Sequence, residues 1–211
     1  MEKYIMKKKL ALINMGIGNI NSVFNALVRL NFDPKIIEDG NSLLKYNPTH
    51  IILPGVGAVG EAINSLEKKN FITSLNELVI KRNVFFLGIC LGMQILAKTC
   101  EEFKVYNALG WIEGNVKKLS NINLSLPHMG WNTIKINSDS NFLKNINNED
   151  MYFAHSNVME CERAVTIGKT EYGINFTSIV KKKNILGIQS HPEKSGRVGK
   201  LFLQSFYDQN Y

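Results

Sequence analysis

Three short apolar runs in the first half of the chain each end directly in a glycine-rich turn. They are "KLALIN" (9–14) before "MGIGN", "HIILP" (50–54) before "GVGAVG", and "VFFLGI" (84–89) before "CLG". Helical periodicity follows at 19–31, 59–68, 72–81 and 91–99. This alternation predicts an α/β protein with a mainly parallel central sheet and helices on both faces.

The second half of the chain has a different pattern. Strand-like segments follow one another with short polar connections, at 115–119, 132–137, 151–156, 163–170, 173–182 and 184–190, and a helical pattern covers 196–209. Consecutive strands with little helix between them predict antiparallel additions to the sheet. No linker, repeat or low-complexity tract interrupts residues 1–211, so we expect a single domain.

The composition is that of a globular protein, with 45% hydrophobic and 20% charged residues. The longest apolar-leaning run, 84–97, is too short to span a bilayer, and the first apolar run ends at Asn14, too early for a signal peptide. We therefore expect a cytoplasmic protein with no membrane partner.

The net charge of +7 raises the question of nucleic acid binding. The lysine clusters at 7–9 and 181–183 adjoin strand-like runs, where lysine commonly protects sheet edges, and no RNA-binding platform or recognition helix is evident. The three cysteines include no CxxC pair and have no zinc-like spacing to the histidines. The sequence thus predicts no nucleic acid partner, no metal and no cofactor; a basic face can still serve an acidic protein or a phosphorylated metabolite.

The turn "GICLG" (88–92) places a cysteine between two glycines. This is the thiol version of the nucleophile elbow, in which the residues two before and two after the nucleophile must be small. The turn would put Cys90 at the start of a helix and would direct the N–H of Leu91 toward the reacting atoms, as half of an oxyanion hole. A buried cysteine can also be a simple apolar residue, which is how we interpret Cys100 and Cys161 because they lack glycine neighbours.

A cysteine nucleophile needs a base, and "GIQSHPEKS" (187–195) offers one at the end of a strand. His191 and Glu193 are two residues apart, so in extended backbone their side chains share a side and the carboxylate can orient the imidazole. His50 opens a strand and is interpreted as structural. His128 and His155 can line the site, but neither has a carboxylate at a useful short spacing.

These motifs resemble those of the class I (triad) glutamine amidotransferases. Within that family the chain is most similar to the glutaminase subunits of imidazole glycerol phosphate synthases. The resemblance covers essentially the full length through "MGIGNINSV", "LPGVGAVGEAI", "LGICLGMQIL", "LPHMGWN", "YFAHS" and "GIQSHPEKSG". "GICLGMQ" and "HPE" are typical of the superfamily, and "PGVGA" and "PHMGWN" of the subunit.

The resemblance implies a flavodoxin-like fold and a Cys-His-Glu triad. Cys90 would attack the side-chain amide of glutamine to form a thioester and release ammonia. His191 would protonate the ammonia and then activate water, while Glu193 holds the imidazole.

Further site residues are implied by the same resemblance. The second oxyanion donor would be a backbone N–H near Val56 or Gly57, where glycine lets the peptide reorient. Gln94 and the backbone near Ser156 would bind the α-amino and carboxylate end of glutamine.

The resemblance also implies a partner, a β/α-barrel cyclase subunit that forms a heterodimer with this chain. The barrel would receive the ammonia away from bulk water and make imidazole glycerol phosphate and AICAR in histidine biosynthesis. We place Met129, Trp131 and Asn132 of "PHMGWN", together with Lys194, at this interface.

The chain departs from the family's usual pattern at Asn14, Met15, Val59 and Asn157. None of these belongs to the triad, so they leave the glutaminase chemistry in place and bear on which acceptor receives the ammonia. Three alternatives remain, which differ in that acceptor or in the use of the thiol. One is a paralogous glutaminase that supplies ammonia to another amidation, such as acetamidino sugar synthesis. The others are a cysteine hydrolase on the same scaffold and a non-enzymatic thiol sensor.

Overall fold

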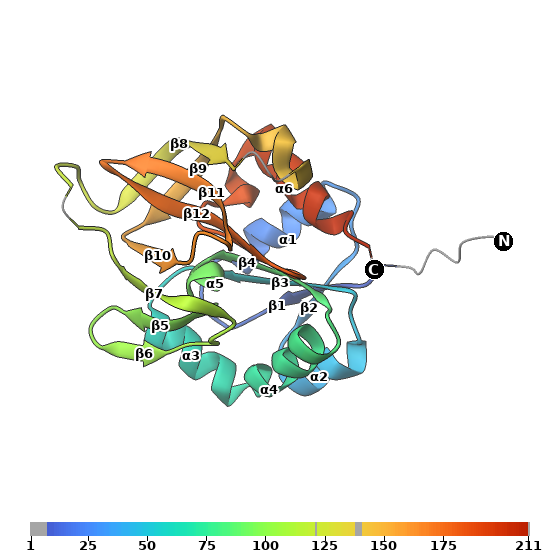
Figure 1. The fold of residues 1–211 in the computed structure, drawn as a ribbon. Helices are drawn as coiled ribbons and strands as arrows, with labels where there is room; N and C mark the ends of the chain where they lie inside the picture. The colour runs from blue at the N-terminus through green and yellow to red at the C-terminus, as the bar shows by residue number, and fades with distance from the viewer. Residues whose placement is uncertain (1–7, 121, 138–140, 211) are drawn as a thin grey trace.

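The computed structural model describes residues 8–120, 122–137 and 141–210, and a β-sheet runs through this part of the chain (Figure 1). The strands are β1 Leu10–Ile13, β2 Pro34–Ile37, β3 His50–Gly55, β4 Phe85–Cys90, β5 Ala97–Glu101, β6 Val105–Asn107, β7 Ile112–Lys118, β8 His128–Ile136, β9 Glu149–His155, β10 Asn157–Cys161, β11 Thr166–Tyr172, β12 Ile174–Lys182 and β13 Ile185–Ile188. The main path has the order β2-β1-β3-β4-β13-β12-β10-β7-β5-β6, and β11 joins β12 to the β8–β9 pair.

Helices connect the strands and cover the sheet. They are α1 Ile20–Val28, α2 Gly40–Tyr46, α3 Val59–Lys68, α4 Phe71–Leu75, α5 Leu91–Gln94 and α6 Gly196–Tyr207, with a π-helical segment at Asn76–Lys81 and 3-10 turns at Asn141–Ile146 and Pro192–Lys194. No helix among the described residues is long and apolar enough to cross a membrane. Residues 1–7, where the sequence predicts no signal peptide, lie outside the described part.

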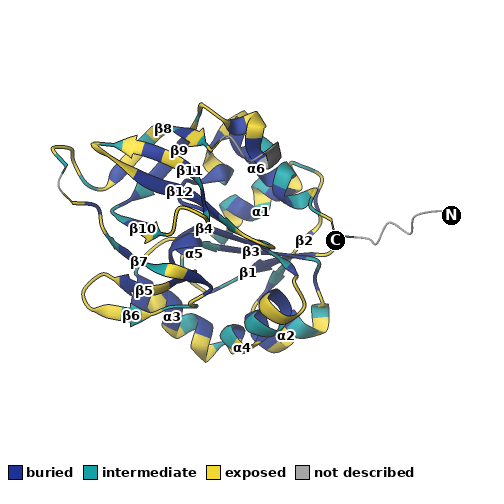
Figure 2. Cartoon of the chain, viewed as in Figure 1, coloured by how far each residue is buried: buried dark blue, intermediate teal, exposed yellow. Residues whose placement is uncertain are grey.

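The parallel strands β2, β1, β3, β4 and β13 lie between two helical layers (Figure 1). Because neighbouring residues of a strand point to opposite faces, Leu10 and Leu12 join the apolar cluster with α1 and α6. Ala11 and Ile13 join the cluster with α2, α3 and α4. Figure 2 shows the central strands buried. This confirms the predicted sheet with helices on both faces, and the strand order is the flavodoxin-like one.

The second half of the chain extends the sheet mainly with antiparallel strands, as predicted. β12 pairs antiparallel with β13, β10 and β11. β8 and β9 form an antiparallel pair in which His128 lies opposite His155 and Trp131 lies opposite Tyr152.

The prediction of a helix over 91–99 is wrong in its second half. α5 ends at Gln94, a turn follows at Ile95 and Leu96, and the chain then forms β5, which pairs with β7 on one side and β6 on the other. Two backbone ladders outweigh a helical pattern of apolar residues, because helix propensity is only a weak local preference. The helix predicted over 72–81 is divided into α4 and the π-helical segment, and the sequence analysis did not predict β2, α2, β6 or β10.

The turn from β4 into α5 depends on two glycines. A Cβ atom on Gly88 would lie 2.3 Å from the carbonyl oxygen of Gly92, and a Cβ atom on Gly92 would lie 1.9 Å from the carbonyl oxygen of Leu53. Main-chain atoms leave no room for either side chain. The first turn of α5 therefore approaches β3 and β4 closely only with glycine at both positions, as the elbow motif predicts.

We expect Gly92→Ala to lower the free energy of unfolding by about 3 kcal/mol or more, because the methyl group would overlap backbone atoms of β3. Gly110→Ala is the control. No atom lies within 4 Å of a Cβ built there, so only the positive φ of 67° opposes the change, at about 1–2 kcal/mol. Urea unfolding measures both variants, and equal losses would contradict the steric explanation.

Candidate active site

Cys90 ends β4 with a φ of 53°, a conformation rarely adopted outside glycine, and it lines a cavity of about 240 Å³. The cavity is lined by Val56, Gly57, Cys90, Leu91, Gln94, Glu102, Pro127, Ala154, His155, Ser156 and Asn157. All the residues predicted as nucleophile, oxyanion hole and glutamine-binding group are in this set. The fold thus brings them together at the carboxyl ends of β3 and β4, where open α/β sheets bind ligands.

His191 and Glu193 follow β13 and form a buried pair. Nδ1 of His191 lies 2.8 Å from Oε1 of Glu193, and their side chains are 2% and 5% exposed. The backbone of His191 is fixed by its N–H, which donates to the Tyr152 carbonyl at 2.8 Å, and by its carbonyl, which accepts from Oγ of Ser195 at 2.6 Å. The pair lines a smaller neighbouring cavity of about 60 Å³, and Val56 borders both cavities.

The electrostatic surroundings of His191 favour the imidazolium form. Burial by itself lowers the pKa, but the interactions with the Cys90 sulfur and the Glu193 carboxylate outweigh burial and raise the pKa to about 10. Nε2 is buried and makes no hydrogen bond within ordinary distance and angle limits. The interaction with Cys90 is therefore better described as attraction between a cation and a nearby sulfur. Since Glu193 holds Nδ1, Nε2 is the ring atom available to a reacting group.

Gln94 and Gln189 connect the Asn157 carbonyl to the Cys90 sulfur. Nε2 of Gln94 donates to the Asn157 carbonyl at 3.0 Å and to Oε1 of Gln189 at 3.2 Å. Nε2 of Gln189 lies 3.6 Å from the Cys90 sulfur. The sequence analysis missed Gln189, although it stands two residues before His191. Asn157 contributes its main-chain carbonyl, so this contact does not depend on the unusual side chain at that position.

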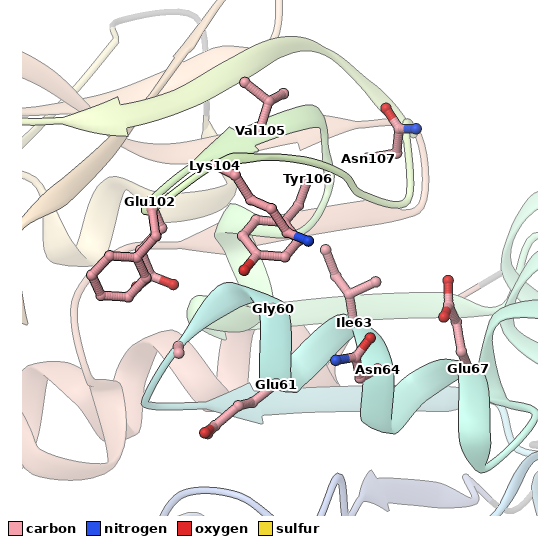
Figure 3. A pocket seen from close by; sticks show the side chains of 12 residues that line it. Gly60, Glu61, Ile63, Asn64, Glu67, Glu102, Lys104, Val105, Tyr106 and Asn107 are labelled. Carbon is pink, nitrogen blue, oxygen red and sulfur yellow. The ribbon is translucent and has the colours of Figure 1, made fainter.

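Glu102 is a second residue that the sequence analysis missed. It follows β5 and lines both the cavity at Cys90 and a larger groove of about 550 Å³ between α3 and the β5–β6 hairpin (Figure 3). Its Oε2 accepts from the N–H of Val59 at 3.0 Å. Tyr106 packs so closely on Gly60 that a Cβ there would lie 2.6 Å from the phenol oxygen. The hairpin therefore fixes the first turn of α3, which follows the loop of Val56 and Gly57.

The residues predicted to contact a partner lie around the outer face of the β8–β9 pair. Met129 and Trp131 are 64% and 58% exposed. Lys194 is also exposed, and its Nζ lies 5.7 Å from the ring centre of Tyr152, which contacts Trp131. Asn132 is only partly exposed, and its side chain is engaged in hydrogen bonds within the protein. Figure 2 shows the exposed segments along this pair.

The remaining unusual positions do not line the cavity at Cys90. Nδ2 of Asn14 donates to Glu38 at 2.9 Å, while Met15 and Val59 are 3% and 1% exposed. Among the described residues, no group of three or more His, Cys, Asp or Glu side chains is arranged to hold a metal ion.

Solved structures share this fold. A crystal structure of a glutamine amidotransferase superposes with a TM-score of 0.73 at 17% identity, over 93% of this chain and 96% of that one. PurLQS from Thermotoga maritima gives 0.72 at 18% identity, over 95% and 98%. At these identities the comparison defines the fold, which is that of glutamine amidotransferases.

Sequence comparisons give the family. Residues 11–209 match the family described as "Glutamine amidotransferase class-I". The "Imidazole glycerol phosphate synthase subunit HisH 2" of Vibrio vulnificus is 38% identical over 95% of this chain and 94% of its own length. The HisH subunit of Archaeoglobus fulgidus is 38% identical over 93% and 96%. The chain therefore belongs to the class I glutamine amidotransferase family.

We expect the pKa of His191 to fall when either neighbour is neutralised. Cys90→Ala removes the larger of the two raising interactions, and Glu193→Gln removes the other. NMR titration of the imidazole measures the shift, and Cys161→Ala should leave it unchanged. A pKa of His191 that is the same in Cys90→Ala and the wild type would contradict the pairing.

The same interaction makes stability depend on pH. Because the folded-state pKa of about 10 exceeds the ordinary value of 6.5, the stabilisation is complete below the lower value and is lost as the pH rises through the higher one. Chemical unfolding should therefore show the difference in stability between wild type and Cys90→Ala shrinking across this interval. A difference that does not change with pH would contradict the assignment.

Proposed function

We propose that this chain is the glutaminase subunit of an imidazole glycerol phosphate synthase. It hydrolyses glutamine to glutamate and ammonia, and the ammonia passes to a β/α-barrel cyclase subunit for histidine biosynthesis in the cytoplasm. The main support is 38% identity to a HisH subunit over 95% of the chain, together with the cavity that joins Cys90, Gln94 and Ser156. The relatives favour this pathway over another amidation, and a general cysteine hydrolase would need neither Gln94 nor "PHMGWN".

Catalysis begins when the Cys90 thiol gives its proton to Nε2 of His191 and the sulfur attacks the amide carbon of the glutamine side chain. As the C–N bond breaks, the nitrogen takes the proton from Nε2 of His191 and leaves as ammonia, and a glutamyl thioester remains. The neutral imidazole then removes a proton from water, the hydroxide attacks the thioester, and glutamate and the thiolate are released. The 2.8 Å contact with Glu193 keeps Nε2 directed to the reacting atoms throughout.

The negative oxygen of each tetrahedral intermediate needs hydrogen-bond donors. The Leu91 N–H is one, and the loop at Val56 and Gly57 supplies the other. Gly57 has a φ of 111° and no atom within 4 Å of a Cβ position, so the peptide before it can reorient without steric hindrance. Partner binding can use this freedom to complete the hole.

The α-amino and α-carboxylate groups of glutamine would be held at the end of the cavity away from the Cys90 sulfur. Both Nε2 protons of Gln94 have acceptors in the protein, so its Oε1 is the atom left to accept from the substrate's α-ammonium group. Glu102 supplies a carboxylate at the same cavity for that cation. The backbone near Ser156 would bind the α-carboxylate.

The barrel partner would dock on the exposed face of β8 and β9, with Met129, Trp131 and Lys194 in contact and Asn132 behind them. Ammonia released next to Cys90 must reach the acceptor unprotonated, since ammonium has no lone pair with which to attack. A closed contact at this face would keep bulk water out of the passage.

We expect Cys90→Ala to lower glutamate release from glutamine by at least about a thousandfold, since the thioester cannot form. The assay uses the chain co-expressed with the barrel cyclase of the same genome, because we expect the isolated chain to be weakly active. Cys161→Ala, a change at another free thiol, is the control and should keep full activity. Glutamate release that survives in Cys90→Ala would refute the mechanism.

The pathway is tested with the same complex. It should form imidazole glycerol phosphate with glutamine as the nitrogen source. Glutamine hydrolysis without that product would keep the glutaminase but reject the histidine pathway.

We expect Trp131→Ala to weaken binding of the barrel subunit by about 2 kcal/mol or more, as for a central interface tryptophan. Ile80→Ala is the control. Ile80 is also exposed, at 47%, but it lies just before the start of β4, and Cys90 is at the other end of that strand. Calorimetric titration measures both, and an unchanged affinity for Trp131→Ala would place the interface elsewhere.

A further inference from the structure

Two buried histidines that the mechanism does not use contact each other next to the cavity. Nδ1 of His128 lies 3.1 Å from Nε2 of His155, and the residues are 3% and 5% exposed. The ring of His128 stacks on both Tyr172 and Phe153, with ring centres 4.0 Å and 4.9 Å apart. Both imidazoles are thereby held in fixed planes.

The protons of this pair have a single consistent arrangement. The Asn157 carbonyl can only accept, so Nδ1 of His155, 3.0 Å away, carries a proton. Burial lowers the pKa of His155 to about 3 and that of His128 to about 4, so each ring is neutral and has one N–H. Nε2 of His155 is therefore an acceptor, and Nδ1 of His128 donates to it.

The chain of hydrogen bonds continues to the surface strands. Nε2 of His128, now an acceptor, lies 3.3 Å from Nδ2 of Asn132. The orientation of that amide is set by two main-chain contacts. Nδ2 also donates to the Glu171 carbonyl at 2.8 Å, and Oδ1 accepts from the Thr133 N–H at 2.8 Å. Each hydrogen bond in this series therefore points the same way, with donors on the Asn132 side and acceptors on the side of the Asn157 carbonyl.

That carbonyl is shared with the glutamine subsite. It accepts from His155 on one side and from Nε2 of Gln94 on the other, each at 3.0 Å. His155, Asn157 and Gln94 all line the cavity. A carbonyl held by two donors cannot turn away from either without leaving a buried polar group unpaired.

We propose that His128 and His155 are positioning residues that hold the Asn157 carbonyl and, through it, the Gln94 amide in the orientation that binds glutamine. The proposal rests on the proposed glutaminase function. With Nε2 of Gln94 held by Asn157 and Gln189, Oε1 is presented to the α-ammonium group of the substrate. Weakening the histidine pair would allow this amide to rotate and would present a donor to a cation.

His128→Phe tests the proposal, because it keeps the stacked ring and removes both ring nitrogens. In the complex with the barrel subunit, we expect KM for glutamine to rise about tenfold, the effect of one buried hydrogen bond, while kcat changes much less. Alkylation of Cys90 by iodoacetamide should be unchanged, since this electrophile does not use the glutamine subsite. His50→Phe is the control. His50 is buried and stacked on Phe85, and it is the first residue of β3, whereas the cavity lies at the carboxyl end of that strand.

Two results would overturn the proposal. One is a KM for His128→Phe that equals that of the wild type or of His50→Phe, in a complex whose wild-type form hydrolyses glutamine. The other comes from nitrogen NMR of the wild-type protein, which should find Nδ1–H tautomers for both His128 and His155. An Nε2–H tautomer at either histidine would contradict the direction of the hydrogen bonds. A wild-type complex without glutaminase activity would instead refute the proposed function. The NMR result would still decide the direction of the hydrogen bonds between Asn132 and Asn157.

Discussion

The parallel pairing of β13 with β4 is the contact on which the rest of the site depends. These strands are about a hundred residues apart in the sequence, yet Gly187 lies beside Gly88 and Ile188 beside Ile89. The register places the end of β13 next to the elbow, so His191 and Glu193 emerge beside Cys90. A shift of one residue would turn every side chain of β13 to the opposite face, and the imidazole would no longer meet the sulfur. Pairing with β12 on the other side of β13 holds this register.

The triad contains buried polar atoms that lack hydrogen-bond partners. Nε2 of His191 and Oε2 of Glu193 are buried without hydrogen-bond partners in the described structure. Such groups destabilise a folded protein, and Nε2 of His191 lies where the proposed mechanism needs a free ring nitrogen to exchange a proton with the substrate. Attraction of the His191 imidazolium to the Cys90 sulfur and to the Glu193 carboxylate compensates for part of their burial. The histidine pair at His128 shows the opposite solution, in which burial keeps both rings neutral and nearly every polar atom has a partner.

Local sequence was a good guide where one physical requirement dominates. The apolar runs predicted β1, β3 and β4, because a strand covered on both faces must be apolar throughout. The predicted helix over 59–68 has the same bounds as α3. The pattern failed after Gln94, where buried residues suit a helix and a strand equally well and pairing with β7 decided the outcome. Glu102 and Gln189 were missed because no local pattern marks a residue whose role depends on which distant segments surround it.

The sequence by itself determined the chemistry that is available: a cysteine between obligatory glycines, a histidine two residues before a glutamate, and the alternation of strands and helices. These depend on short-range sterics and periodicity, which neighbouring residues specify. Only the tertiary structure decided which groups share the cavity, which carbonyl Gln94 and His155 both contact, and which histidines are neutral. Those properties depend on desolvation and on contacts between distant segments, and neither exists until the sheet has assembled.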